Sequence, residues 1–321
     1  MKCIFFDKTA PEMKALILSE KPADLDLVFW EELPDDASRS TVLAEIEGAL
    51  TAVYPVTREL MQQMPKLRIA QKVGVGTDNI DEQAANELGI AIGNVPGGNA
   101  NGVTELTFAY ILSLYRHLPA LNAGTKNGKW LMFDYRSSSY EIRGKTHGII
   151  GFGNIGKGVA RLAKAFGSEV LYYDAFRASQ QEEAALGARY VELDELLRQA
   201  DIISVHVPLL PATANLINAK KLALVKQNAI LINVSRGNVV NEADLYQALV
   251  EKRLAGAAVD VWEQEPINPA NPLLKLDNVI ATPHIGGGTV DASRNVFHKS
   301  FLNVRACLLG EAFHALNRKD N

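Results

Sequence analysis

The chain has 321 residues and a formal net charge of -4, with 47% hydrophobic and 22% charged residues. These proportions are typical of a folded globular protein, and the length exceeds what one hydrophobic core usually serves, so we expect two domains. A slightly acidic chain makes nucleic acid and anionic membrane surfaces poor candidate partners.

The placement of cysteines and charges indicates the compartment. The two cysteines, Cys3 and Cys307, stand at opposite ends of the chain and cannot form a disulfide framework, and neither has a metal-ligand spacing. Asp7 places a charge too early for the core of a signal peptide, and no apolar run approaches the roughly 20 residues that span a bilayer. We therefore expect a cytoplasmic protein that holds no metal.

Residues 1–98 alternate short apolar runs with helical patterns, which predicts a parallel sheet covered on both faces. A loop rich in glycine, proline and asparagine follows at 93–99. A helix with apolar residues at helical spacing then runs from Val103 to an expected end near Pro119. The predicted strands in this part of the chain are 3–6, 25–29, 49–54, 67–72 and 90–92.

A second alternating series opens near Lys145. Six short segments rich in β-branched residues, separated by helical stretches, fit a doubly wound nucleotide-binding sheet. The tail from 291 to about 309 has a helical pattern again. The predicted strands of this series are 147–150, 170–173, 202–207, 230–234, 257–261 and 279–281.

The sharpest local signal is the glycine motif GFGNIG at 151–156, which follows a predicted strand and opens a predicted helix. In a dinucleotide-binding motif, Gly151 permits the tight turn, Gly153 lets a pyrophosphate approach the backbone, and Gly156 lets the helix pack close to the sheet. The positive end of that helix then faces the phosphates. The alternative, a structural turn, requires strand, glycines and helix to fall in register by chance.

The cofactor preference is predicted from an acidic residue. Asp174 ends the next predicted strand, where its carboxylate can accept hydrogen bonds from the adenosine ribose hydroxyls. The same carboxylate would repel a 2′-phosphate, so the sequence predicts NAD rather than NADP. Arg177, three residues later, is the one feature that could weaken this preference.

Three further segments each follow a predicted strand, at the edge where open α/β sheets bind ligands. They are NVSRGNVVNE at 233–242, DVWEQEP at 260–266 and TPHIGG at 282–287. Together with the glycine motif and VHVPL at 205–209, they closely resemble the D-isomer-specific 2-hydroxyacid dehydrogenases. That family includes glyoxylate and hydroxypyruvate reductases and D-lactate, D-glycerate, phosphoglycerate and formate dehydrogenases. The resemblance, from about Ala49 to Gly287, implies hydride transfer between nicotinamide and C2 of a small 2-hydroxy or 2-oxo acid.

The resemblance also implies a catalytic set of Arg236, Glu265 and His284, and the chemistry fits these residue types. Arg236 can hold the substrate carboxylate with a bidentate fork and polarise the 2-oxo group. His284 can give a proton to the carbonyl oxygen during reduction and remove it during oxidation. Glu265 can accept from the other imidazole nitrogen and favour the protonated ring. Formate dehydrogenases carry glutamine here, so Glu265 argues against that branch.

Further contacts are implied by the resemblance alone. Val75 and Gly76 would offer backbone N–H groups to the substrate carboxylate, and Asn99 would border the substrate. The implied cofactor contacts, besides the three motif glycines and Asp174, are Asn154 and Ile155 at the pyrophosphate, Val207 and Pro208 on the adenosine side, Thr213 at a phosphate or ribose, Asp260 at the nicotinamide amide, and Val234 and Ser235. The other histidines are interpreted as structural: His117, His147, His206, His298 and His314.

The chain departs from the family in one loop. Phosphoglycerate dehydrogenases carry a Val-Arg-Ser stretch after an N-terminal strand, whereas this chain has Val53, Tyr54 and Pro55. The arginine that would meet a phosphate is therefore missing, and the chain ends without the added regulatory domain of many of those enzymes. Both points predict unphosphorylated substrates.

The predicted fold is two doubly wound α/β domains, a flavodoxin-like substrate domain (1–99 and 288–321) and a Rossmann NAD-binding domain (100–287), with the active site in the cleft between them. The family implies a homodimer that uses the helix from Val103 and the segment 130–136. Two alternatives stay open: an NAD-sensing corepressor scaffold of the same fold, which could retain the catalytic set, and a phosphite dehydrogenase, which shares the motifs.

Overall fold

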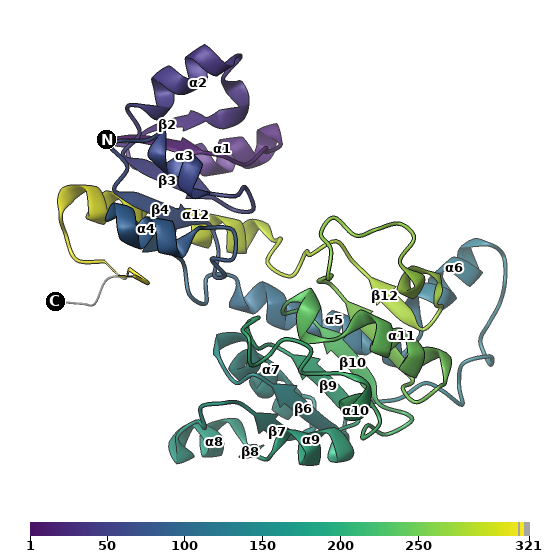
Figure 1. Ribbon diagram of the computed structural model, residues 1–321. Coiled ribbons are helices and arrows are strands. Elements are labelled where there is room, and N and C mark those ends of the chain that lie inside the picture. Colours follow the sequence, from purple (N-terminus) through teal and green to yellow (C-terminus); the bar gives the residue numbers. More distant parts are fainter. Residues whose placement is uncertain (314, 318–321) are drawn as a thin grey trace. The chain divides into compact units, whose positions relative to one another are not determined.

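The computed structural model describes residues 1–313 and 315–317, and the chain divides into two compact units (Figure 1). The first unit comprises Met1–Asn99 and Thr289–Asn321, and the second comprises Ala100–Gly288. The chain thus leaves the first unit once and returns to it.

The first unit is a five-stranded parallel sheet with the order β2-β1-β3-β4-β5. Four of its strands, β1, β3, β4 and β5, are largely buried on both faces, whereas the edge strand β2 is mostly half-buried or exposed. The expected strands are confirmed, although the one predicted at 49–54 ends at Thr51. The strands are β1 (Lys2–Phe5), β2 (Asp26–Phe29), β3 (Gly48–Thr51), β4 (Ile69–Lys72) and β5 (Ala91–Gly93).

Two hydrophobic clusters cover the two faces of this sheet. One contains residues of α2, α3 and α4, and the other contains residues of α1 and of α12, the helix formed when the chain returns. The helices α2, α3 and α4 are capped at their N-termini by the side chains of Asp35, Thr57 and Asp81, respectively, each of which accepts a hydrogen bond from a backbone N–H. The helices are α1 (Pro11–Glu20), α2 (Asp36–Leu43), α3 (Arg58–Gln62), α4 (Glu82–Leu88) and α12 (Val290–Leu309), with a 3-10 turn η1 (Trp30–Glu32).

The second unit is a seven-stranded parallel sheet with the order β12-β11-β10-β9-β6-β7-β8. The order reverses between β6 and β9, which is the topological switch point of a doubly wound sheet. All six predicted strands are present, and the sequence pattern missed only the short edge strand β8. The strands are β6 (Thr146–Ile150), β7 (Glu169–Tyr173), β8 (Ala188–Tyr190), β9 (Ile202–Val205), β10 (Ile230–Asn233), β11 (Gly256–Val259) and β12 (Val279–Ala281).

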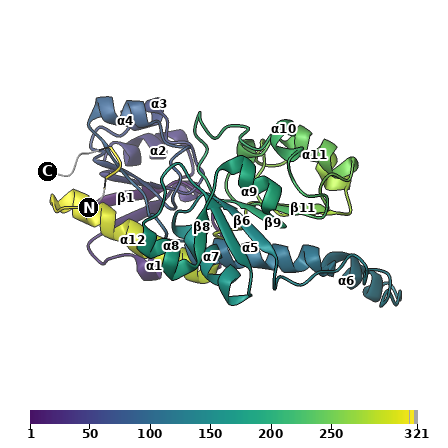
Figure 2. The ribbon, with the colours of Figure 1, turned by 90° about the horizontal axis from the view of Figure 1, so that it is seen from below.

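Helices cover both faces of the second sheet (Figure 2). Residues of α5, α7 and α8 belong to one hydrophobic cluster, and residues of α9, α10 and α11 belong to the other. These elements are α5 (Ala100–Tyr115), α6 (Leu118–Lys126), α7 (Asn154–Ala165), α8 (Gln180–Leu186), α9 (Leu193–Gln199), α10 (Ala219–Leu222) and α11 (Glu242–Val250), with the 3-10 turns η2 (Gly237–Val239) and η3 (Pro272–Lys275).

The predicted end of the long helix near Pro119 is wrong. α5 ends at Tyr115, His117 adopts a left-handed conformation with a φ of 50°, and Pro119 lies in the first turn of α6. Proline is tolerated there because the first N–H groups of a helix have no partner within it. Within residues 1–313 and 315–317, no helix is both long enough and apolar enough to cross a membrane.

Candidate active site

The glycine motif joins β6 to α7 in the way that dinucleotide binding requires. Gly151 has a φ of 97°, and a Cβ on it would lie 2.7 Å from the backbone of His206 and Val207. A Cβ on Gly156 would lie 2.0 Å from the carbonyl oxygen of Gly151. By contrast, a Cβ on Gly153, the N-cap of α7, would meet nothing within 4 Å. Two glycines therefore permit close packing, and the third leaves bare backbone at a helix N-terminus, which fits a pyrophosphate.

Asp174 lies beside this loop, directly after β7. Its carboxylate accepts hydrogen bonds from the backbone N–H of Phe152, at 2.6 Å, and of Phe176, at 2.9 Å. In the motif itself, Asn154 is exposed and Ile155 is half-buried in the first turn of α7. The predicted ribose and pyrophosphate contacts thus stand at one edge of the sheet.

The loop after β9 carries the residues expected on the adenosine side. Val207 is buried and Pro208 is exposed. The Thr213 hydroxyl donates to the carbonyl of Pro208 at 2.6 Å and accepts from the N–H of Leu210 at 2.8 Å. Thr213 therefore closes its own loop, a role that the sequence did not suggest, and its contact with the cofactor remains a prediction.

Arg236 follows β10, after the buried Val234 and Ser235. The Asn233 side chain accepts from the Ser235 hydroxyl at 2.9 Å and donates to the carbonyl of Arg236 at 3.0 Å. The Arg236 guanidinium donates to the carbonyl of Ser235 at 2.8 Å. These bonds fix the turn that presents the arginine.

The Arg236 turn packs against the loop after β11. A Cβ on Gly237 would lie 2.0 Å from the backbone of Trp262, so only glycine fits. The indole N–H of Trp262 in turn donates to the carbonyl of Thr282 at 2.9 Å. The loops after β10, β11 and β12, which carry the three predicted catalytic residues, are therefore tied together.

His284 and Glu265 form a hydrogen-bonded pair across two of these loops, which is an ion pair when the imidazole is protonated. Nδ1 of His284 donates to Glu265 at 2.8 Å, and the other carboxylate oxygen accepts from the N–H of Trp262 at 3.0 Å. Burial raises the pKa of the Glu265 carboxyl, but the bonds from His284 and Trp262 and the charge of Arg236 outweigh it, and the net pKa is lowered. The carboxylate thus stays ionised near neutral pH.

Asp260, predicted at the nicotinamide amide, has a role that the sequence reasoning missed. The side chain is 1% exposed. Its carboxylate accepts from the Thr282 hydroxyl at 2.6 Å and from the N–H groups of Ile285 and Gly286, each at 2.8 Å. Asp260 thereby holds the loop that carries His284.

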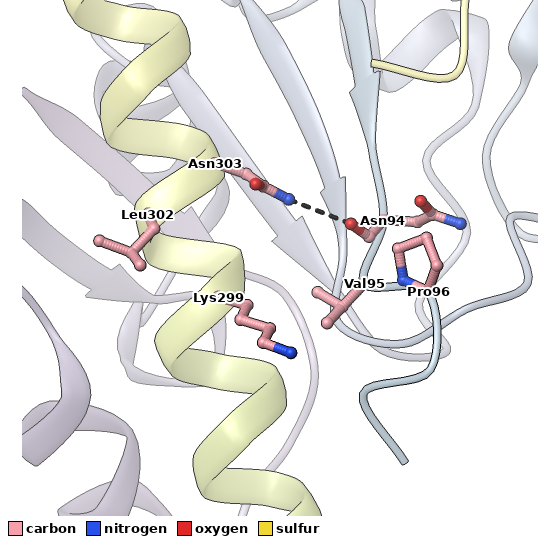
Figure 3. Close-up of a pocket in the computed structure, with 6 residues that line it drawn as sticks. All are labelled: Asn94, Val95, Pro96, Lys299, Leu302 and Asn303. Atoms are coloured by element: carbon pink, nitrogen blue, oxygen red, sulfur yellow. Dashed lines mark hydrogen bonds between the residues drawn. The ribbon is translucent and has the colours of Figure 1, made fainter. Parts of the chain in front are cut away.

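In the first unit, a buried asparagine supports the loop of Val75 and Gly76. The Asn94 side chain donates to the carbonyl of Val75 at 2.7 Å, and it points away from α12 in Figure 3. The Asn303 side chain donates to the carbonyl of Asn94 at 3.0 Å, as the dashed line in Figure 3 shows. Sequence reasoning missed Asn94, although it stands in the glycine-rich segment singled out at 93–99. Asn99 is half-buried at the end of the same segment.

Residues 52–55 of the loop after β3 include no cationic side chain, although the Lys72 ammonium of β4 donates to the carbonyl of Ala52. Tyr54 turns inward and stacks on Phe6 with ring centroids 5.2 Å apart, whereas Val53 is 80% exposed. The Asp7 carboxylate accepts three N–H groups of this loop, from residues 52–54, at 2.5 to 2.8 Å. The loop therefore has a defined shape and presents an apolar side chain.

Two other histidines lie inside the second unit, His147 buried and His206 half-buried. Nε2 of His147 and Nε2 of His206 each lie 2.9 Å from the hydroxyl of Ser204. Burial lowers the pKa of both rings to about 3, so both are neutral at ordinary pH, as a structural role requires. His314 lies outside the described residues. Within the described part of the chain, no group of three or more His, Cys, Asp or Glu could hold a metal ion.

Comparison with known proteins defines the class. The family model for the NAD-binding domain of D-isomer-specific 2-hydroxyacid dehydrogenases matches residues 108–286. The chain belongs to this family.

Its relatives define the activity more closely. It is 37% identical to a glyoxylate reductase of Korarchaeum cryptofilum over 96% of this chain and 93% of that one. It is 40% identical to a D-3-phosphoglycerate dehydrogenase of Methanocaldococcus jannaschii over 82% of this chain, but it spans only 49% of that relative. The structure of an NAD-dependent formate dehydrogenase from Staphylococcus aureus with NAD matches with a TM-score of 0.83 and 28% identity, over 98% and 97% of the two chains. The chain is an NAD-dependent 2-hydroxyacid dehydrogenase.

Two glycine variants test the cofactor loop. Gly153→Ala should retain the melting temperature, because its Cβ has open space, but should weaken NADH binding on the order of tenfold by blocking the approach of the pyrophosphate. Gly156→Ala, by contrast, should both weaken NADH binding and lower the melting temperature, because its Cβ would meet the carbonyl of Gly151. Thermal unfolding and fluorescence titration with NADH measure both effects. Unchanged NADH affinity in Gly153→Ala would remove this loop from the pyrophosphate site.

Proposed function

We propose that the enzyme interconverts small unphosphorylated 2-oxo acids and their D-2-hydroxy acids, with glyoxylate and its close analogues as the first candidates. The observation that carries this proposal is the His284–Glu265 ion pair, on loops tied to the Arg236 turn. The relatives named glyoxylate reductase, matched over nearly the whole chain, support the substrate class.

Arg236 is proposed to bind the substrate carboxylate and polarise the neighbouring 2-oxo group. A guanidinium presents two parallel N–H donors that match a carboxylate, and it keeps its charge at any physiological pH. The charge of Arg236 contributes to lowering the pKa of Glu265, which supports its place near the ion pair. In the first unit, the N–H groups of Val75 and Gly76 are proposed as further carboxylate donors, with Asn99 bordering the substrate.

His284 is proposed as the acid–base residue. Nδ1 is bonded to Glu265, so Nε2 is the nitrogen that exchanges a proton with the substrate oxygen. NADH, when bound, supplies the hydride to C2. During reduction His284 gives its proton to the C2 oxygen, and during oxidation it accepts that proton. Glu265, ionised because its pKa is lowered, stabilises the protonated ring.

A homodimer is proposed from an exposed apolar segment in the second unit. Trp130, Met132 and Phe133 are 80%, 51% and 69% exposed. Contiguous apolar side chains in water commonly mark an interaction surface, and a second copy of the chain is the partner that the family suggests. Light scattering that gives the mass of one 35.0 kDa chain would contradict this.

The substrate class is tested by NADH oxidation with glyoxylate, hydroxypyruvate, pyruvate, 2-oxobutyrate and longer 2-oxo acids. The smallest acids should have the highest kcat/KM. In the reverse direction, 3-phosphoglycerate should be a poorer substrate than glycerate or lactate, because Val53 is apolar and Tyr54 is stacked on Phe6. A preference for 3-phosphoglycerate would contradict our interpretation of that loop. Phosphite-dependent NADH formation, with no activity on any of these acids, would favour a phosphite dehydrogenase.

Arg236→Lys should lower kcat/KM on the order of 100-fold although the charge is kept. A lysine ammonium cannot form two parallel hydrogen bonds to a carboxylate and polarise the adjacent carbonyl as well. NADH affinity, measured by fluorescence titration, should stay near that of the unmodified enzyme. Kinetics within a factor of two of that enzyme would remove Arg236 from the substrate site.

The ion pair is tested by the pH dependence of reduction. His284→Ala should lower turnover about 10²–10⁴-fold and leave NADH binding nearly intact. In Glu265→Gln the side chain still forms hydrogen bonds but carries no charge, so the protonated ring loses its support and the alkaline limb of the reduction profile should move to lower pH. The pKa of Glu265 is lowered from an ordinary value of 4.5. The carboxylate should therefore stabilise the protonated ring at every pH above about 4.5 and lose this effect only at more acidic pH. Superimposable profiles for Glu265→Gln and the unmodified enzyme would disprove the coupling.

A further inference from the structure

A bidentate ion pair stands next to the predicted ribose-binding carboxylate. Arg177 lies three residues beyond Asp174, in the loop between β7 and α8. Its Nε donates to one carboxylate oxygen of Glu183 at 2.9 Å, and its terminal nitrogen donates to the other at 3.0 Å. Two parallel charge-assisted bonds of this kind give both strength and a fixed orientation.

Glu183 is itself held in place. The hydroxyl of Tyr172, a fully buried residue of β7, donates to Glu183 at 2.7 Å and accepts from the N–H of Ala178 at 3.0 Å. Burial, followed by the bond to Glu183, raises the pKa of Tyr172 to about 12, so it stays a donor. The Glu183 side chain is 13% exposed, against 59% for Arg177. The arginine is therefore held by an anchored carboxylate.

The neighbouring cation is paired in the same way. Lys157, which directly follows the glycine motif, forms a salt bridge with Glu182. Glu182 and Glu183 are consecutive residues of α8, so one helix neutralises both cations beside the motif and Asp174. A 2′-phosphate, with its two negative charges, would need such a cation to offset its repulsion by Asp174.

We propose that Glu183 is a specificity-determining residue: by holding Arg177 against α8, it withholds from the cofactor an arginine that could otherwise bind a 2′-phosphate. Selectivity for NAD then has two sources, repulsion by Asp174 and the engagement of Arg177 by Glu183. The inference rests on the proposed position of Asp174 at the adenosine ribose. It does not depend on which 2-oxo acid the enzyme reduces.

Fluorescence titration with NADH and NADPH tests this without turnover. Glu183→Gln keeps the size of the side chain and its bond to Tyr172 but removes the charge that holds Arg177. The variant should bind NADPH about tenfold more tightly than the unmodified enzyme does, the worth of one charge-assisted contact, with NADH affinity changed less than about twofold. Combining it with Arg177→Gln should abolish the gain, whereas Arg177→Gln alone should leave NADPH affinity unchanged.

The matched control is Glu195→Gln, which removes the same charge from α9, where Glu195 pairs with Arg189 at 3.6 Å. It should change neither affinity. Unchanged NADPH affinity in Glu183→Gln, or an equal gain in Glu195→Gln, would overturn the proposal, as would a loss of NADPH affinity in Arg177→Gln alone. An enzyme that binds NADH and reduces no 2-oxo acid would contradict the proposed function, and the titrations would still decide the role of Glu183.

Discussion

The buried carboxylate of Asp260 is the constraint on which the proposed catalytic loops depend. His284 has a φ of 55°, in the left-handed region, which costs a residue other than glycine about 1–2 kcal/mol. The N–H of His284 donates to the carbonyl of Asp260, and the next two N–H groups donate to its carboxylate. Thr282 donates its hydroxyl hydrogen to the same carboxylate and accepts one from the hydroxyl of Tyr110, which completes the cluster. Both the backbone strain and the hydrogen bonds that compensate for it are thus located at His284, the proposed acid–base residue.

Local patterns in the sequence were enough to predict the fold. Most strands of the two sheets are short apolar runs, and the glycine motif predicts the turn between β6 and α7 because its requirements lie within six residues. The pattern was weakest where an element is very short, as in the three-residue β8. It was also weak where a proline is compatible with two different positions relative to a helix, as at Pro119. A proline near a helix boundary can follow one helix or begin the next, and tertiary packing decides which.

The supporting residues of the site could not be predicted, because their partners are distant in the chain. Nothing near Asn94 indicates that its amide holds the carbonyl of Val75, nineteen residues away. The inward orientation of Tyr54 depends on Phe6, which belongs to another strand end. Motifs identify the side chains expected to touch a ligand. The residues that hold those side chains in place, such as Asn94, depend instead on how loops meet at one edge of a sheet. Glu183 lies only six residues from Arg177, but the sequence does not show which of the consecutive Glu182 and Glu183 pairs with it.

The buried Ser204 hydroxyl between His147 and His206 has a consequence for the protons of the two rings. The hydroxyl has a single hydrogen, and it lies 2.9 Å from Nε2 of each imidazole. Both rings are neutral, so the hydroxyl can donate to only one Nε2 and must accept an N–H from the other. His147 on β6 and His206, directly after the neighbouring β9, are therefore held in opposite tautomers, and their protons can exchange places only in concert.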